Sequence, residues 1–142
     1  MTAAIFPGVL TAYITGHWLG DYWVQANAQA AHKGLPGWPG RRACAAHVGT
    51  YTLTLAARLA LAWWWLDLPV HPVWAAAGLA VSGVTHYCAD RRRPRRWLAG
   101  QIPGKLAFWQ AGDGLASGGV LLDQAWHWRW LFAAALITAG AR

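Results

Sequence analysis

Four stretches of mainly hydrophobic residues alternate with segments that contain proline, glycine and basic residues. The stretches cover about residues 3–31, 43–66, 72–90 and 115–139. Each is near the roughly 20 residues that an α-helix needs to cross the hydrocarbon core of a bilayer. The pattern therefore predicts an all-α integral membrane bundle of four transmembrane helices. It forms a single domain over residues 1–142, with a basic cytoplasmic loop at 91–114.

The composition favours the same interpretation. The chain is 56% hydrophobic and only 12% charged, whereas a soluble domain carries about 25% charged residues. Its twelve Trp residues are of a type that concentrates at membrane interfaces. Most Lys and Arg residues lie in the first and third connections, so the positive-inside rule predicts that both termini are outside a bacterial cytoplasmic membrane.

The predicted partners follow from the charge of +7. The lipid bilayer is the first, and the basic run Arg91–Arg96 is expected to lie against its anionic headgroups. Nucleic acid is not expected, because no reader motif accompanies this run. A homo-oligomer is possible on the sequence alone.

Ionisable and polar residues interrupt every hydrophobic stretch at helical spacing. Spacings of three and four place such residues on one face of a helix. In the predicted topology all of these faces lie in the cytoplasmic half of the bundle, which predicts one shared cluster. The four sets are His17, Asp21 and Gln25; His47, Tyr51, Thr54 and Arg58; His86 and Asp90; and Asp123 and His127.

The cluster has the side chains of a metal site. His and Asp are common ligands of zinc, manganese and iron, and a bound divalent metal can activate water for hydrolysis. The predicted metal ligands, enough for two ions, are His17, Asp21, His47, His86, Asp90, Asp123 and His127. The predicted catalytic residues are Asp21, His47 and His127. The predicted substrate-binding residues are Gln25, Tyr51, Gln124 and Arg58, with Arg58 contacting the phosphate of a lipid or lipid-linked substrate.

Four ordered motifs carry a resemblance to a known family. They are "HWLGDYWVQ" followed by Lys33, then "AAHVGTYT", "THYCAD" and "LLDQAWH". The set resembles a family of small bacterial and phage-encoded integral membrane proteins known only as a domain of unknown function. The chain departs from that family in the basic residues after Asp90 and in its many Trp residues. The resemblance implies a four-helix fold and the polar set His17, Asp21, Gln25, Lys33, His47, His86, Asp90, Asp123, Gln124 and His127.

The leading hypothesis is thus a membrane-embedded, metal-dependent hydrolase. Two alternatives belong to other classes. The polar cluster could be a proton or ion path in a channel or transporter-like subunit. It could also join helices by hydrogen bonds in a partner-binding protein, for example a phage or mobile-element factor. A membrane-tethered nucleic-acid binder that uses Arg91–Arg96 is a weaker alternative.

Overall fold

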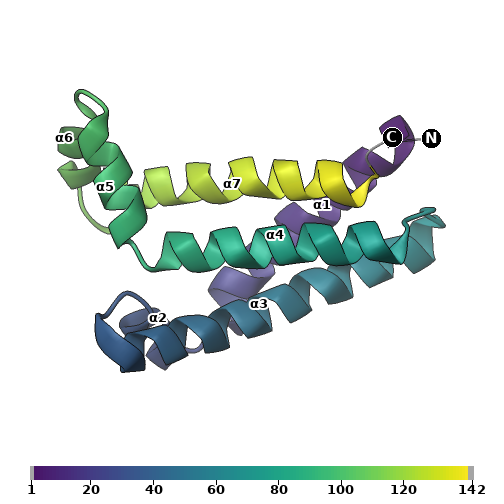
Figure 1. The fold of residues 1–142 in the computed structure, drawn as a ribbon, viewed down its shortest axis with the longest axis horizontal. Coiled ribbons are helices and arrows are strands. Elements are labelled where there is room, and N and C mark those ends of the chain that lie inside the picture. Colours follow the sequence, from purple (N-terminus) through teal and green to yellow (C-terminus); the bar gives the residue numbers. More distant parts are fainter. Residues whose placement is uncertain (1, 141–142) are drawn as a thin grey trace.

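Four long helices, which run alternately in opposite directions, form the body of the molecule (Figure 1). The computed structural model describes residues 2–140 of the chain. Each long helix packs against two others in the cyclic order α1, α3, α4, α7. These helices are α1 (Thr2–Leu19), α3 (Gly37–Leu66), α4 (Pro72–Asp90) and α7 (Gly118–Thr138). Residues 2–140 are helical without any strand, as expected for an all-α chain.

The prediction of transmembrane helices is wrong. No helix within residues 2–140 combines the length and the apolar character needed to cross a membrane. Charged residues lie inside the long helices: Arg58 in α3, for example, and Asp123 and Arg129 in α7. The predicted integral membrane bundle is overturned by this finding. So is the predicted multi-pass location in a bacterial cytoplasmic membrane with both termini outside.

The first hydrophobic stretch is not one helix. α1 ends at Leu19 and continues into a π-helical turn, η1 (Gly20–Val24), which is closed by a hydrogen bond from the Gln25 amide to the Gly20 carbonyl (3.1 Å). Gln25 and Ala26 are extended, and α2 (Asn27–His32) follows. Gly20 allows close packing, because a Cβ there would lie 3.0 Å from the ring of Tyr51. π-Helical turns are frequent at functional sites.

The predicted basic loop is also more ordered than expected. It contains α5 (Arg93–Gln101), α6 (Lys105–Gln110) and the short 3₁₀-helix η2 (Gly114–Ala116). These elements lie at the same end of the bundle as α2, opposite the end where the described chain starts and finishes (Figure 1). α7 then begins at Gly118, and the hydroxyl of the preceding Ser117 accepts a hydrogen bond from the Val120 amide (3.3 Å) as the helix N-cap.

The apolar core and the polar residues occupy different parts of the bundle. The core contains Val9, Tyr13, Leu55 and Leu131, each at most 2% exposed. These side chains come from α1, α3 and α7. The buried histidines lie nearer the end that carries α2, α5 and α6, since they follow the core residues in α1 and precede them in α3 and α7. The core therefore holds the helices so that their polar ends face one another.

Candidate metal centre

Four side chains from three elements meet between the helices. Asp21 belongs to η1, His47 to α3, and His86 and Asp90 to α4, where they are four residues apart. We call these four residues the carboxylate–imidazole cluster. Both histidines are at most 1% exposed, and Asp90 is 4% exposed. The Asp90 carboxylate is therefore mostly shielded from solvent, and the Asp21 side chain, 11% exposed, is less so.

The cluster brings one atom of each side chain into a compact group. His47 Nε2 lies 3.0 Å from His86 Nε2, 3.2 Å from Asp21 Oδ1 and 3.4 Å from Asp90 Oδ2. His86 Nε2 lies 3.3 Å from each of the same two oxygens. In a tetrahedral zinc site with bonds of about 2.0–2.1 Å, neighbouring ligand atoms are about 3.3–3.4 Å apart. The atoms of His47, His86 and Asp90 thus have the mutual spacing of ligands around one metal ion, and Asp21 Oδ1 lies beside the two histidines.

Hydrogen bonding within the cluster does not satisfy these atoms. Asp21 Oδ1 and Asp90 Oδ2 are buried, and neither has a hydrogen bond of acceptable geometry within residues 2–140. Each histidine Nε2 has three close neighbours but carries at most one hydrogen. Unsatisfied buried carboxylate oxygens are costly, and a divalent cation among His47, His86 and Asp90 would offset that cost. The residues present fit a zinc ion by geometry and by ligand type.

The carboxylates and histidines of the cluster change one another's pKa values. Burial raises the pKa of each carboxyl group, but the neighbouring histidines outweigh it. The pKa of Asp90 falls to about 2 beside His86 and Lys33, and the pKa of Asp21 lies far below its usual range beside His47 and His86. Burial alone would lower the pKa of His86, but Asp21 and Asp90 raise it to about 9. Two carboxylates therefore favour positive charge at this position.

Neighbouring side chains hold the cluster in place. Lys33 Nζ lies 2.8 Å from Asp90 Oδ1, the oxygen that points away from the histidines. The ring of Tyr51 stacks on His86 with 3.7 Å between ring centroids, and its hydroxyl lies 3.2 Å from Ser82 Oγ. Tyr51, which the sequence indicated as a substrate-binding residue, is only 1% exposed and so supports a histidine instead.

The other three predicted metal ligands lie beside the cluster. His17 Nδ1 is 3.5 Å from Asp21 Oδ2, and its Nε2 is 3.2 Å from Gln124 Oε1. His127 donates from Nδ1 to the carbonyl of Asp123 (2.8 Å), and its ring stacks on His17. The structure brings His17, Asp21 and His86 close enough for a second cation group. His127, predicted as catalytic, packs against the rings of His17 and His86 without joining the four clustered atoms.

Asp123 is held by a residue that the sequence pattern did not single out. Arg95 Nη2 lies 2.7 Å from Asp123 Oδ1, and Arg95 Nε donates to the Ala89 carbonyl (2.9 Å). Arg95 is only 7% exposed, although it belongs to the run Arg91–Arg96 that was predicted to face lipid headgroups. Its one sequence signal was its place within that run, which indicates charge but not burial.

A cavity of about 500 Å³ leads to the carboxylate side of the cluster. Asp21 and Asp90 line it together with Gln25 and Gln124, two of the predicted substrate-binding residues. Arg58, the last of the four predicted substrate-binding residues, borders a different cavity beside Thr11 and Thr15 and does not approach the cluster. The basic side chains that do line the cavity are Lys33, Arg92 and Arg95.

Comparisons with known proteins add nothing to this picture: no family model, no curated protein and no solved structure matches the chain. The resemblance drawn from the four sequence motifs therefore stays a prediction.

Proposed function

We propose that this protein is a divalent-metal-dependent hydrolase of phosphate esters, with zinc bound by His47, His86 and Asp90 and with Asp21 beside it. The observation that carries the proposal is that these three residues offer ligand atoms within 4.8 Å of one another, with His47 Nε2, His86 Nε2 and Asp90 Oδ2 separated by 3.0–3.4 Å. Two imidazoles and one carboxylate suit zinc better than magnesium or calcium, which prefer more oxygen ligands. Three protein ligands also leave the fourth position of zinc open for water, as in catalytic zinc sites.

Two buried donors without partners in the described chain support an anionic substrate, although the three acidic and three basic side chains that line the cavity balance in charge. The guanidinium of Arg95 is fixed by Asp123 and Ala89, and its remaining group, Nη1, is buried without a hydrogen-bond partner in the described chain. Gln25 Nε2 is a second buried donor without a partner there. Both residues line the cavity beside the carboxylates of the cluster. Arginine binds phosphate oxygens well, because its N–H groups match their geometry.

The proposed reaction is hydrolysis of a phosphate monoester. The oxygen of water forms a bond to phosphorus, and the bond between phosphorus and the ester oxygen breaks. One water proton stays on the phosphate product and the other reaches the alcohol, so the atoms balance. Bound zinc would supply Lewis acidity and would lower the pKa of a water at the position that the protein ligands leave open. Arg95 and Gln25 orient the phosphoryl group, and Lys33 holds Asp90.

The first test is the zinc content of the purified protein, measured by elemental mass spectrometry after dialysis against zinc. We expect about one zinc ion per chain in the wild type. We expect a large loss in His86→Ala and in Asp90→Ala. His32→Ala is the matched control, because His32 is exposed in α2 and its Nδ1 bonds only to the Ala28 carbonyl of its own helix.

The second test is hydrolysis of p-nitrophenyl phosphate by the same samples, with circular dichroism to verify folding. Zinc-dependent release of p-nitrophenol that His86→Ala loses supports the proposal. Folded wild type that binds no zinc would overturn it and leave the cluster as a hydrogen-bonded junction between helices. Folded protein that binds zinc but hydrolyses no phosphate ester would overturn the hydrolase and leave a structural metal site.

A further inference from the structure

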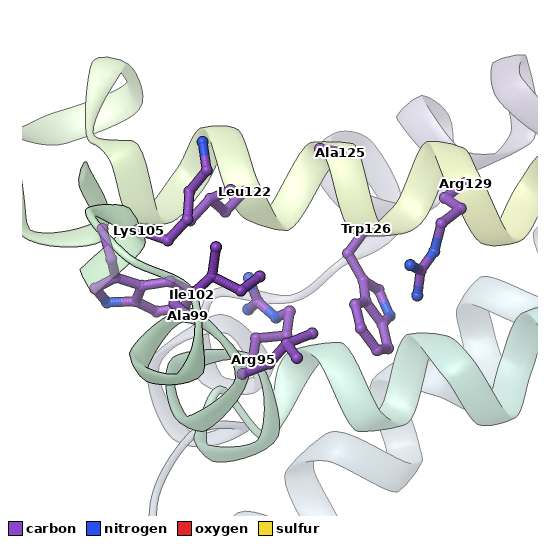
Figure 2. A pocket seen from close by; sticks show the side chains of 10 residues that line it. Arg95, Ala99, Ile102, Lys105, Leu122, Ala125, Trp126 and Arg129 are labelled. Atoms are coloured by element: carbon purple, nitrogen blue, oxygen red, sulfur yellow. The ribbon is translucent and has the colours of Figure 1, made fainter. Parts of the chain in front are cut away.

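A second, mainly apolar cavity lies directly beside the proposed phosphate site. It has a volume of about 270 Å³ and is bounded by α5, α6 and α7 (Figure 2). Its apolar walls include Leu98, Ile102, Leu122 and Trp126. None of the residues of the carboxylate–imidazole cluster lines it. The cavity is therefore not an extension of the metal site itself.

Two residues border both cavities. Arg95 and Trp109 line the apolar cavity and also the larger cavity that reaches Asp21 and Asp90. The Arg95 guanidinium carbon lies 5.3 Å from the centroid of the Trp109 ring, which is within the range of a cation–π contact. A ligand whose anionic group contacts Arg95 consequently has an apolar surface next to that group.

The charges around the apolar cavity favour an anionic ligand over a neutral one. Arg129, at the far side from Arg95, lies over the rings of Trp126 and Trp130 at 4.9 and 5.1 Å (Figure 2). Lys105 also borders the cavity, and no acidic side chain lines it within the described part of the chain. Ligand pockets usually have volumes of about 300–1,000 Å³, so this one suits a single ring or a short chain.

From these contacts we infer that the substrate is an amphipathic phosphate ester whose alkyl or aryl group occupies the cavity between α5, α6 and α7. This inference rests on the proposed function, because it places the phosphoryl group at Arg95. It narrows the substrate class from phosphate esters in general to esters with a small hydrophobic alcohol. Arg95 marks the point where the polar and apolar parts of the ligand meet.

The test measures the affinity of alkylphosphonates, which contain a phosphorus–carbon bond and cannot be hydrolysed as esters. Methyl- and butylphosphonate are titrated into zinc-loaded protein by isothermal titration calorimetry. Each buried methylene is expected to tighten binding about fourfold, so the butyl compound, with three more methylenes, should bind about 60-fold more tightly than the methyl compound.

A cavity-filling variant tests whether the alkyl group of butylphosphonate occupies this cavity. Ala125 lines the cavity and is itself exposed, so Ala125→Leu adds volume there without disturbing the core. We expect the butyl-to-methyl affinity ratio to fall below about fivefold, the equivalent of roughly one buried methylene. Ala57→Leu is the matched control, because Ala57 is an exposed alanine of α3 away from both cavities; it should keep the wild-type ratio.

The outcomes separate the two proposals. Equal affinities for the methyl and butyl compounds in zinc-loaded wild type would overturn the inference and leave the proposed function intact. If Ala125→Leu and Ala57→Leu both keep the butyl-to-methyl affinity ratio of the wild type, the alkyl group does not occupy this cavity. If the folded protein binds neither zinc nor a phosphonate, both proposals are overturned.

Discussion

The Nε2 atoms of His47 and His86 lie 3.0 Å apart, although the two residues come from different helices, α3 and α4. One hydrogen can bridge two imidazole nitrogens, but each nitrogen also faces the carboxylate oxygens of Asp21 and Asp90 at 3.2–3.4 Å. A shared cation explains all of these distances together. This pair is therefore the most sensitive place to test for a metal.

Zinc is expected to stabilise the folded protein. A ligand that binds only the native state at 100 times its Kd adds about 2.7 kcal/mol to the free energy of unfolding. Thermal unfolding, followed by circular dichroism in zinc and then in EDTA, should show a higher Tm with zinc. His47→Ala should abolish the difference, and His32→Ala should keep it. Equal Tm values for wild type in zinc and in EDTA would contradict the prediction.

Lys33 is expected to tune the metal affinity without binding the metal. Its ammonium group holds Asp90 Oδ1 at 2.8 Å, and loss of such an outer partner typically costs 10–100-fold in metal affinity. Lys33→Met should weaken zinc binding by about that factor, as measured by competition with a chromogenic chelator. Lys105→Met is the control, since Lys105 lies in α6 and borders only the apolar cavity. Unchanged affinity in Lys33→Met would argue that Asp90 does not bind the metal.

The contact between Arg95 and Asp123 is expected to contribute to stability. Arg95 is 7% exposed and Asp123 is 23% exposed, and burial already raises the pKa of the Asp123 carboxyl despite the arginine. Loss of one partner of a buried ion pair lowers the free energy of unfolding by about 3–5 kcal/mol. Because Asp123 is partly exposed, the loss in Arg95→Met should lie at or below the lower end of that range.

A double-mutant cycle tests this pair by urea denaturation. Arg95→Met combined with Asp123→Leu should be less destabilised than the sum of the two single variants, because neither charge is then left alone. Additive losses would show that the two side chains act independently. Arg96→Met is the control, since Arg96 is an exposed arginine on the same helix.

Replacement by alanine should change the free energy of unfolding in opposite directions at two glycines. A Cβ at Gly78 would meet Thr138 Oγ1 and lie 2.7 Å from the Ala134 carbonyl oxygen, so Gly78→Ala should lower the free energy of unfolding by about 1–3 kcal/mol. At Gly49 a Cβ would meet no described atom within 4 Å. Gly49→Ala should raise stability by about 0.5–1 kcal/mol, because alanine favours the helix. Urea denaturation measures both, and a stabilised Gly78→Ala would contradict the close packing of α4 on α7.

The positions of several helical segments and of the main polar residues could be predicted from sequence. Hydrophobic stretches gave helices, and α4 covers the same residues, 72–90, as the third predicted stretch. The i, i+4 spacing placed His86 with Asp90, and their Nε2 and Oδ2 atoms do lie 3.3 Å apart. These features depend on local geometry, so the sequence contains the information needed for them. Average hydrophobicity was a poorer guide, because no helix of residues 2–140 combines the length and the apolar character needed to cross a membrane.

By itself, then, the sequence determined the helical class and the supply of His and Asp side chains on helix faces. Only the tertiary structure decided which of them meet. The π-helical turn at 20–24 places Asp21 against His47 and His86, whereas α5 packs beside α7 and pairs Arg95 with Asp123. Arg58 shares a helix face with His47 but lies three turns further along α3, in another cavity. The physical reason is that ligand contacts depend on how helices pack, and packing is set by long-range contacts that local spacing does not encode.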